Sequence, residues 1–282
     1  MRKAQRREIW RRLRKNKLAM VGLVIVAIFV LVAIFADVIA DYNTKAIGMS
    51  REILKDPSPE HLCGTDALGR DIFARLVHGS RVSLSIGIII TIFSFAVGGI
   101  LGALAAYTGG LLDNIVMRIC DTLMCIPSIL MALAIVAALG TNMTNLVIAI
   151  TISSVPGYIR FIRSVILTVV GQDYIEAARS CGLSKMQIIT SHVLPNAIGP
   201  IIVNMSMSVA GMILSAAGLS YVGMGVQPPR PEWGAMLSEA SVNMRKHPYL
   251  VIFPGLCILL AALSLNLFGD GLRDALDPRL KD

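Results

Sequence analysis

VSLSIGIIITIFSFAVGGILGALAAY, residues 82–107, decides the fold class of this chain, because its 26 residues contain no charged side chain. An α-helix rises about 1.5 Å per residue, so about 20 apolar residues cross the hydrocarbon core of a bilayer. The stretch also carries Gly98, Gly99 and Gly102, and small residues at this spacing let two membrane helices approach closely. It predicts a transmembrane helix that packs tightly against a neighbour.

Five more apolar stretches follow the same pattern. Each is long enough to cross a bilayer as a helix, and they lie at residues 18–39, 117–139, 145–170, 197–217 and 249–269. The whole chain is 55% hydrophobic and 16% charged, whereas a typical soluble domain is about 25% charged. The apolar blocks are continuous and lack the alternation of β-barrel strands. The sequence therefore predicts an all-α membrane protein with six transmembrane helices.

Positive charge is concentrated at the start of the chain. Residues 1–17 contain nine lysines and arginines and one acid, Glu8. Basic segments beside a span stay in the cytoplasm, so both ends of a six-span chain are expected there. The predicted organisation is a basic cytoplasmic segment (1–17), a first transmembrane helix (18–39), an extracytoplasmic segment (40–80), a five-helix core (82–270) with a cytoplasmic loop at 171–193, and a cytoplasmic tail (271–282).

The first apolar stretch differs in length from a signal peptide. It has no charge from residue 18 to residue 36, whereas the apolar region of a signal peptide is about 7–15 residues long. We expect a retained membrane anchor, with cleavage after Ala40 as the alternative.

The loop after the fourth predicted span carries sequence signals that mark where helices begin and end. It reads DYIEAARSCGLSKMQIITSHVLP from residue 173 to residue 195. Asp173 and Glu176 have the spacing of a capping box, as do Ser184 and Gln187, and Gly182 between them is typical of a helix end. The loop is therefore predicted to form two short helices joined by a glycine bend. From the residues alone, their apolar side chains could pack on the protein's own core or in the groove of a partner.

Four segments of the chain resemble one family of permeases. Glu176, Ala177, Ala178 and Gly182, followed by Leu194-Pro195, match the EAA motif of permease subunits of bacterial ABC importers, although His192 replaces an aliphatic residue. The other three segments resemble the dipeptide/oligopeptide/nickel permease group: CGTDALGRD at 63–71, LSYVGMGVQPPRPEWGAM at 219–236 and DPRL at 277–280. The chain most resembles the shorter, C-type permease subunit of that group.

The resemblance implies a fold, a set of partners and a function. The fold would be the type I permease bundle of ABC importers, in the bacterial cytoplasmic membrane. The partners would be a second permease subunit in a heterodimer, two ATP-binding-cassette ATPase subunits and an extracellular or periplasmic solute-binding protein. Glu176, Ala177, Ala178 and Gly182 would couple this chain to the ATPase. The cargo would be di- or oligopeptides, with nickel, haem, opines, glycosides or antimicrobial peptides as alternatives, and a non-transporting receptor or scaffold as a further one.

Several kinds of site are not expected in this chain. The sequence contains no GxxxxGK[ST] segment and no HExxH, so ATP and Mg²⁺ are expected on the partner ATPase subunits and no catalytic residue or cofactor is assigned here. His61 and Cys63 are too few to hold a metal ion. The basic N-terminal segment lacks interleaved aromatic side chains, so we expect a lipid bilayer as its partner and no nucleic acid.

Polar residues inside the spans are candidates for the translocation path. Asn204 and Ser208 lie in the fifth predicted span, where they could line a path or bond to a neighbouring helix. The charged residues of the third and fourth spans are expected to pair or reach the inner surface (Arg118, Asp121, Arg160 and Arg163). Pro127 is expected to kink the third span. Trp233 is expected either at the lipid interface or in a docking face for the binding protein.

Overall fold

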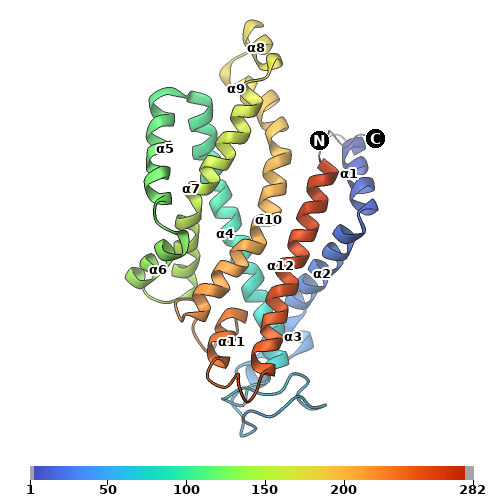
Figure 1. Ribbon diagram of the computed structural model, residues 1–282. Coiled ribbons are helices and arrows are strands. Elements are labelled where there is room, and N and C mark those ends of the chain that lie inside the picture. The colour runs from blue at the N-terminus through green and yellow to red at the C-terminus, as the bar shows by residue number, and fades with distance from the viewer. Residues whose placement is uncertain (1–2, 277–282) are drawn as a thin grey trace.

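The computed structural model describes residues 3–276, and its regular elements are all helical, apart from one isolated β-bridge between Thr65 and Asp71 (Figure 1). In chain order the elements are α1 (Lys3–Lys15), α2 (Lys17–Ile34), α3 (Ala36–Ile39), the π-helical turn η1 (Tyr42–Ala46), α4 (Ile72–Thr108), α5 (Gly110–Met124), α6 (Ser128–Leu139), α7 (Met143–Val170), α8 (Asp173–Ser180), α9 (Lys185–Ile188), the π-helical turn η2 (Ile189–Val193), α10 (Leu194–Tyr221), α11 (Trp233–Ala240) and α12 (Tyr249–Leu276).

The long helices run side by side between two ends of the molecule. One end carries α8 and α9, and the other carries α11 and the segment 41–71 (Figure 1); we refer to them as the α8 end and the α11 end. Five helical stretches of the described chain are long and apolar enough to cross a membrane (Lys17–Ile34, Ile72–Thr108, Met143–Val170, Met186–Tyr221 and Tyr249–Leu276). The all-α membrane fold expected from the sequence is therefore confirmed.

The sixth predicted span is not a single helix. The stretch predicted at 117–139 is built from α5 and α6, which meet at an angle of 84°. Proline cannot donate a helical hydrogen bond, and Pro127 sits at the junction as the residue before α6. The chain tightens there, with Ile126 N donating to Leu123 O at 3.2 Å. A kink was expected and a break is found, whereas Pro156 lies inside α7, which continues as one helix.

Helices α4 and α7 touch at two glycines. A side-chain carbon added at Gly98 would lie 2.7 Å from Cβ of Tyr158, and one added at Gly102 would lie 2.7 Å from the carbonyl oxygen of Ile159. Gly99 points elsewhere, since its nearest neighbour would be Cδ1 of Ile162 at 3.8 Å. The close helix approach predicted from these glycines is confirmed for two of the three.

The segment 41–71 is folded against the α11 end. His61 lies between two carboxylates, with 2.7 Å from Nδ1 to Asp71 Oδ2 and 2.7 Å from Nε2 to Glu52 Oε2. Asp71 also accepts a hydrogen bond from the backbone N–H of Ala74 and so caps α4. These bonds hold the segment in place without a disulfide, because all five cysteines of the chain are free thiols.

Trp233 is buried rather than exposed. None of its side chain is accessible, and its Nε1–H donates to Leu76 O at 3.1 Å. Both expectations for Trp233, a lipid-interface anchor and a docking face, are therefore wrong. The indole fills the gap between α4 and α11, beside Gly79 and Phe29.

We expect Gly102→Ala to destabilise the protein and Gly99→Ala to leave it stable or slightly more stable. The methyl group at Gly102 would meet backbone of α7, and overpacking costs about 1–3 kcal/mol. Alanine at Gly99 meets only a flexible side-chain end and improves helix propensity by about 1 kcal/mol. Thermal unfolding midpoints in detergent test the pair. Equal midpoints for the two variants would contradict the assigned contact.

The hydrogen bonds of His61 predict a pH dependence. Asp71, and then Glu52, raise the pKa of His61 above its ordinary 6.5. Its contribution to stability is therefore complete below 6.5 and is lost as the pH rises through the raised pKa. Lys55 and then His61 lower the pKa of Glu52 below its ordinary 4.5. The Glu52 carboxylate therefore stabilises the fold at higher pH, and this stabilisation is lost only as the pH falls through the lowered pKa. The unfolding midpoint of His61→Gln should fall below wild type by more at about pH 6 than at about pH 9. A deficit independent of pH would contradict this.

Candidate functional site

The loop 171–193 forms the first short helix expected from its sequence, with a shift at its start, whereas the second, α9, is the beginning of a longer helical stretch. The N-cap of α8 is Gln172, and its side chain makes no capping bond, so the capping box predicted for Asp173 and Glu176 is absent. The second capping box is present, because Ser184 N–H donates to Gln187 Oε1 at 2.8 Å and Gln187 N–H donates to Ser184 Oγ at 3.4 Å.

The motif residues of α8 divide between a buried and an exposed face. Ile175 and Ala178 are buried in a cluster with residues of α7 and α10, so part of the apolar surface packs on the protein's own core. Glu176 and Ala177 are exposed. Among the side chains that the structure describes, none makes a hydrogen bond or an ion pair with the Glu176 carboxylate.

Gly182 makes the bend between the two helices. Its φ is +78°, a backbone conformation that residues other than glycine rarely adopt. A Cβ added there would have no atom within 4 Å. Gly182 N–H donates to Arg179 O at 2.9 Å and Leu183 N–H donates to Ala178 O at 3.3 Å, which closes the end of α8. The glycine is required by the turn and leaves open space beside it.

The chain does not break where it leaves this loop. The elements α9, η2 and α10 follow one another without a gap from Lys185 to Tyr221. Pro195 is the second residue of α10 and directly follows the π-helical turn η2. One continuous helical rod therefore connects the α8 end to the middle of the bundle.

A recess of about 440 Å³ opens beside the break between α5 and α6. Met124, Pro127 and Phe161 contribute apolar surface, and Ser154 and Asn204 contribute neutral polar groups. Asn204, one of the two path candidates, thus lines the recess. Ser208 is not among the lining residues; its hydroxyl donates to Asn204 O at 2.7 Å. The sequence contained no signal for the recess itself, because the break in the span creates it.

Two ion pairs join α5 to α7 near this recess. Arg163 donates to both carboxylate oxygens of Asp113, at 2.5 and 2.6 Å. Arg160 donates to Asp121. The expectation that these charges pair is confirmed for Asp121, Arg160 and Arg163, and the partner in each case comes from the adjacent helix.

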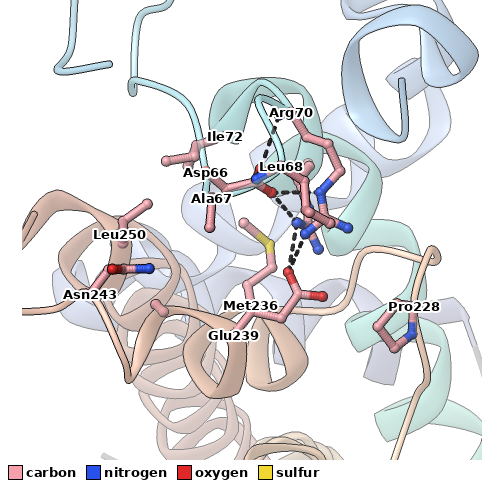
Figure 2. Close-up of a pocket in the computed structure, with 12 residues that line it drawn as sticks. Asp66, Ala67, Leu68, Arg70, Ile72, Pro228, Met236, Glu239, Asn243 and Leu250 are labelled. Atoms are coloured by element: carbon pink, nitrogen blue, oxygen red, sulfur yellow. Dashed lines mark hydrogen bonds and ion pairs between the residues drawn. The ribbon is translucent and has the colours of Figure 1, made fainter. Parts of the chain in front are cut away.

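A second cavity, of about 300 Å³, lies at the α11 end (Figure 2). Its charged wall joins the segment 41–71 and α4 to α11, because Arg70 and Arg75 both donate to Glu239 of α11, and Arg70 also donates to Asp66 at 2.6 Å. Both arginines are almost fully buried. Asp66 and Arg70 thus bond within this chain. Glu239 was missed, because no local pattern marks a residue whose partners lie 164 and 169 positions earlier in the chain.

The chain matches two family models. The model described as the binding-protein-dependent transport system inner membrane component matches residues 98–282, and the N-terminal TM domain of oligopeptide transport permease C matches residues 4–57. The DPRL segment at 277–280 lies within the first match and outside the described residues.

Curated proteins and a solved structure agree with these matches. The chain is 44% identical over 274 residues to the glutathione transport system permease protein GsiD of Escherichia coli O6:K15:H31, covering 97% of this chain and 90% of that protein, and it is equally similar to GsiD of Shigella boydii serotype 4. The fold resembles a chain of the inward-facing MetNI methionine ABC transporter, with a TM-score of 0.61 and 18% identity over 73% of this chain and 98% of that one.

Members of such a family are multi-pass inner membrane permeases without catalytic activity of their own, and ATP binds to separate ATPase subunits. The chain therefore belongs to the inner membrane components of binding-protein-dependent transport systems, as an ABC importer permease of the oligopeptide/dipeptide (permease C) group.

Proposed function

We propose that this chain is the shorter of two permease subunits in an ATP-driven importer for short peptides. The observation that carries the proposal is the 44% identity over 97% of the chain to permeases named for glutathione, which is a tripeptide. The second permease would complete the path as a heterodimer, and an extracellular or periplasmic binding protein would deliver the peptide.

The α8 end would face the cytoplasm in the bacterial inner membrane. The basic helix α1 supports this orientation, because it packs beside the last turns of α12, where Leu13 and Ala275 are buried together. Clustered positive charge stays on the cytoplasmic side, which supports a cytoplasmic location for both termini. The segment 41–71 and α11 would then face outward, toward the binding protein.

Coupling to the ATPase would use the exposed face of α8. Glu176 and Ala177 are free to contact a partner, and Gly182 leaves open space at the tip of the loop. Ala178, buried at 9% exposure, would contribute by seating α8 on the core. Closure of the ATPase pair would move α8, and the unbroken helix from Lys185 to Tyr221 would carry that movement to the bundle.

The translocation path would pass the recess at the α5–α6 break. Asn204 lines it, and Ser208 sits one turn further along α10, bonded to the Asn204 carbonyl. Because the helical stretch that begins at α9 contains Asn204, a shift of the loop 171–193 would change the shape of this recess. Alternating access would then follow from this helical connection between the loop 171–193 and the recess.

Glu176→Lys and Gly182→Asp should abolish uptake while the protein stays in the membrane at normal level. The Glu176 carboxylate has no bond among the side chains that the structure describes, and a side chain at position 182 would meet no atom within 4 Å and would bear only the strain of a φ of +78°, so the defect should be loss of ATPase binding. Gly223→Asp is a matched control, because Gly223 has a φ of +81° and no neighbour within 4 Å at the other end of α10. Co-purification of the ATPase with Gly223→Asp and not with Gly182→Asp is expected. Normal uptake by both coupling variants would refute the assignment.

Growth of an amino-acid auxotroph on peptides tests the cargo. A strain that lacks this gene should fail to grow on di- to pentapeptides that supply the required amino acid and should grow normally on the free amino acid. The intact gene should restore growth, and the Glu176→Lys gene should not. Unchanged growth of a strain without other peptide importers would reject peptides as the cargo and turn attention to the other cargoes of this group.

A further inference from the structure

Helix α1 has one face on the protein and one face that is open. On the inner face, Leu13 is buried in a cluster with Ala19 of α2 and Ala275 of α12. The outer face carries four exposed residues at the spacing i, i+3, i+4 and i+7, which places them on one side of a helix. These residues, which we call the α1 face, are Arg7, Trp10, Arg11 and Arg14.

Most of the positive charge on the α1 face is unpaired. Glu8 is the single acid of α1, and its carboxylate accepts hydrogen bonds from both Arg11 and Arg12, at 2.8 and 3.1 Å. Among the side chains that the structure describes, none makes a hydrogen bond or an ion pair with Arg7 or Arg14. One carboxylate thus serves two arginines, and two further guanidinium groups keep their N–H donors for a ligand.

The α1 face lies at the level where the last span ends. Leu13 packs with Ala275 in the last turns of α12, where the apolar sequence of that helix gives way to charged residues. Asn16, between α1 and α2, donates to Asp274 at 3.3 Å. Trp10 is 50% exposed at this level, and tryptophan is enriched where lipid headgroups meet acyl chains, because its ring is apolar and its N–H is polar.

The position of α1 in the bundle favours lipid over a second protein as its partner. One residue, Asn16, separates α1 from α2, and Ala19 and Gly22 are the only buried residues among the 18 of α2. An apolar helix with so little buried surface faces lipid on most sides. Helix α1 lies beside the end of α12 and away from α8 (Figure 1), so the proposed ATPase contact on α8 leaves the α1 face free.

The chemistry of the α1 face suits an anionic lipid. Guanidinium groups bind phosphate through paired N–H bonds. An anionic membrane surface strengthens the binding of each lysine or arginine beside it by about fivefold. A zwitterionic headgroup carries its phosphate next to an ammonium group, which repels arginine. A face with excess positive charge therefore selects headgroups with net negative charge.

We propose that the α1 face binds anionic phospholipids in the leaflet at the α8 end, with Arg7 and Arg14 on their phosphate groups and Trp10 against their acyl chains. Bound lipid would anchor the corner of the bundle formed by α1, α2 and α12, because Leu13 and Asn16 join α1 to α12. This lipid site is independent of the cargo and goes beyond the proposed import function.

The two tryptophans of the chain make the site measurable. Trp10 lies on the α1 face and Trp233 is fully buried at the α11 end, so the fluorescence that Trp10→Phe removes reports position 10. The full chain is placed in nanodiscs of phosphatidylcholine and phosphatidylglycerol at one fixed ratio. Either lipid in turn is brominated on its acyl chains, which quenches an indole in contact with it. The ratio of the two quenching efficiencies gives the preference of the site for the anionic lipid.

Phosphatidylglycerol should be preferred beside Trp10 by about fivefold or more, and Arg7→Gln combined with Arg14→Gln should lower that preference by about fivefold or more. The matched control, Arg245→Gln combined with Lys246→Gln, removes two exposed charges between α11 and α12 and should keep the preference. Equal quenching by both brominated lipids in the wild type, or quenching of Trp10 by neither, would overturn the proposal. So would an unchanged preference in the double arginine variant or an equal loss in the control.

Discussion

The close approach of α4 and α7 at Gly98 and Gly102 is the contact on which the rest of the structure depends. Lipid gives helices no hydrophobic reason to associate, so association in a membrane relies on close packing and polar contacts. Helix α7 then places three features at fixed positions. Its end carries the loop 171–193, its middle lines the recess, and its arginines meet the aspartates of α5.

The two ends of the bundle are stabilised in different ways. At the α11 end, Arg70 and Arg75 are buried against Asp66 and Glu239, and removing one member of such a group leaves a buried charge uncompensated. At the α8 end, Glu176 and Ala177 are exposed, and a Cβ added at Gly182 would have no atom within 4 Å. This difference fits the proposed function, in which the α11 end faces outward and stays ordered, and the α8 end is contacted by a moving ATPase.

A broken span gives the bundle its recess. The recess lies at the 84° bend between α5 and α6 and is lined by Ser154 and Asn204, while α6 itself packs against α7. The break does not expose backbone to lipid at great cost, because Cys125 and Ile126 donate to carbonyls of the preceding turn. The break at Pro127 therefore forms the recess and leaves the backbone N–H groups of Cys125 and Ile126 bonded.

The sequence by itself determined the membrane-spanning class, the approximate spans, the short helix α8 and the start of a second helix after Gly182, because hydrophobic length, glycine spacing and capping pairs are local properties. It also indicated Asn204 as a polar residue within a span. Tertiary structure alone decided that Trp233 is buried, that Glu239 meets Arg70 and Arg75, and that Asp121 pairs with Arg160. These contacts join positions far apart in the chain, so their partners are fixed by how the helices pack and not by any pattern along one helix.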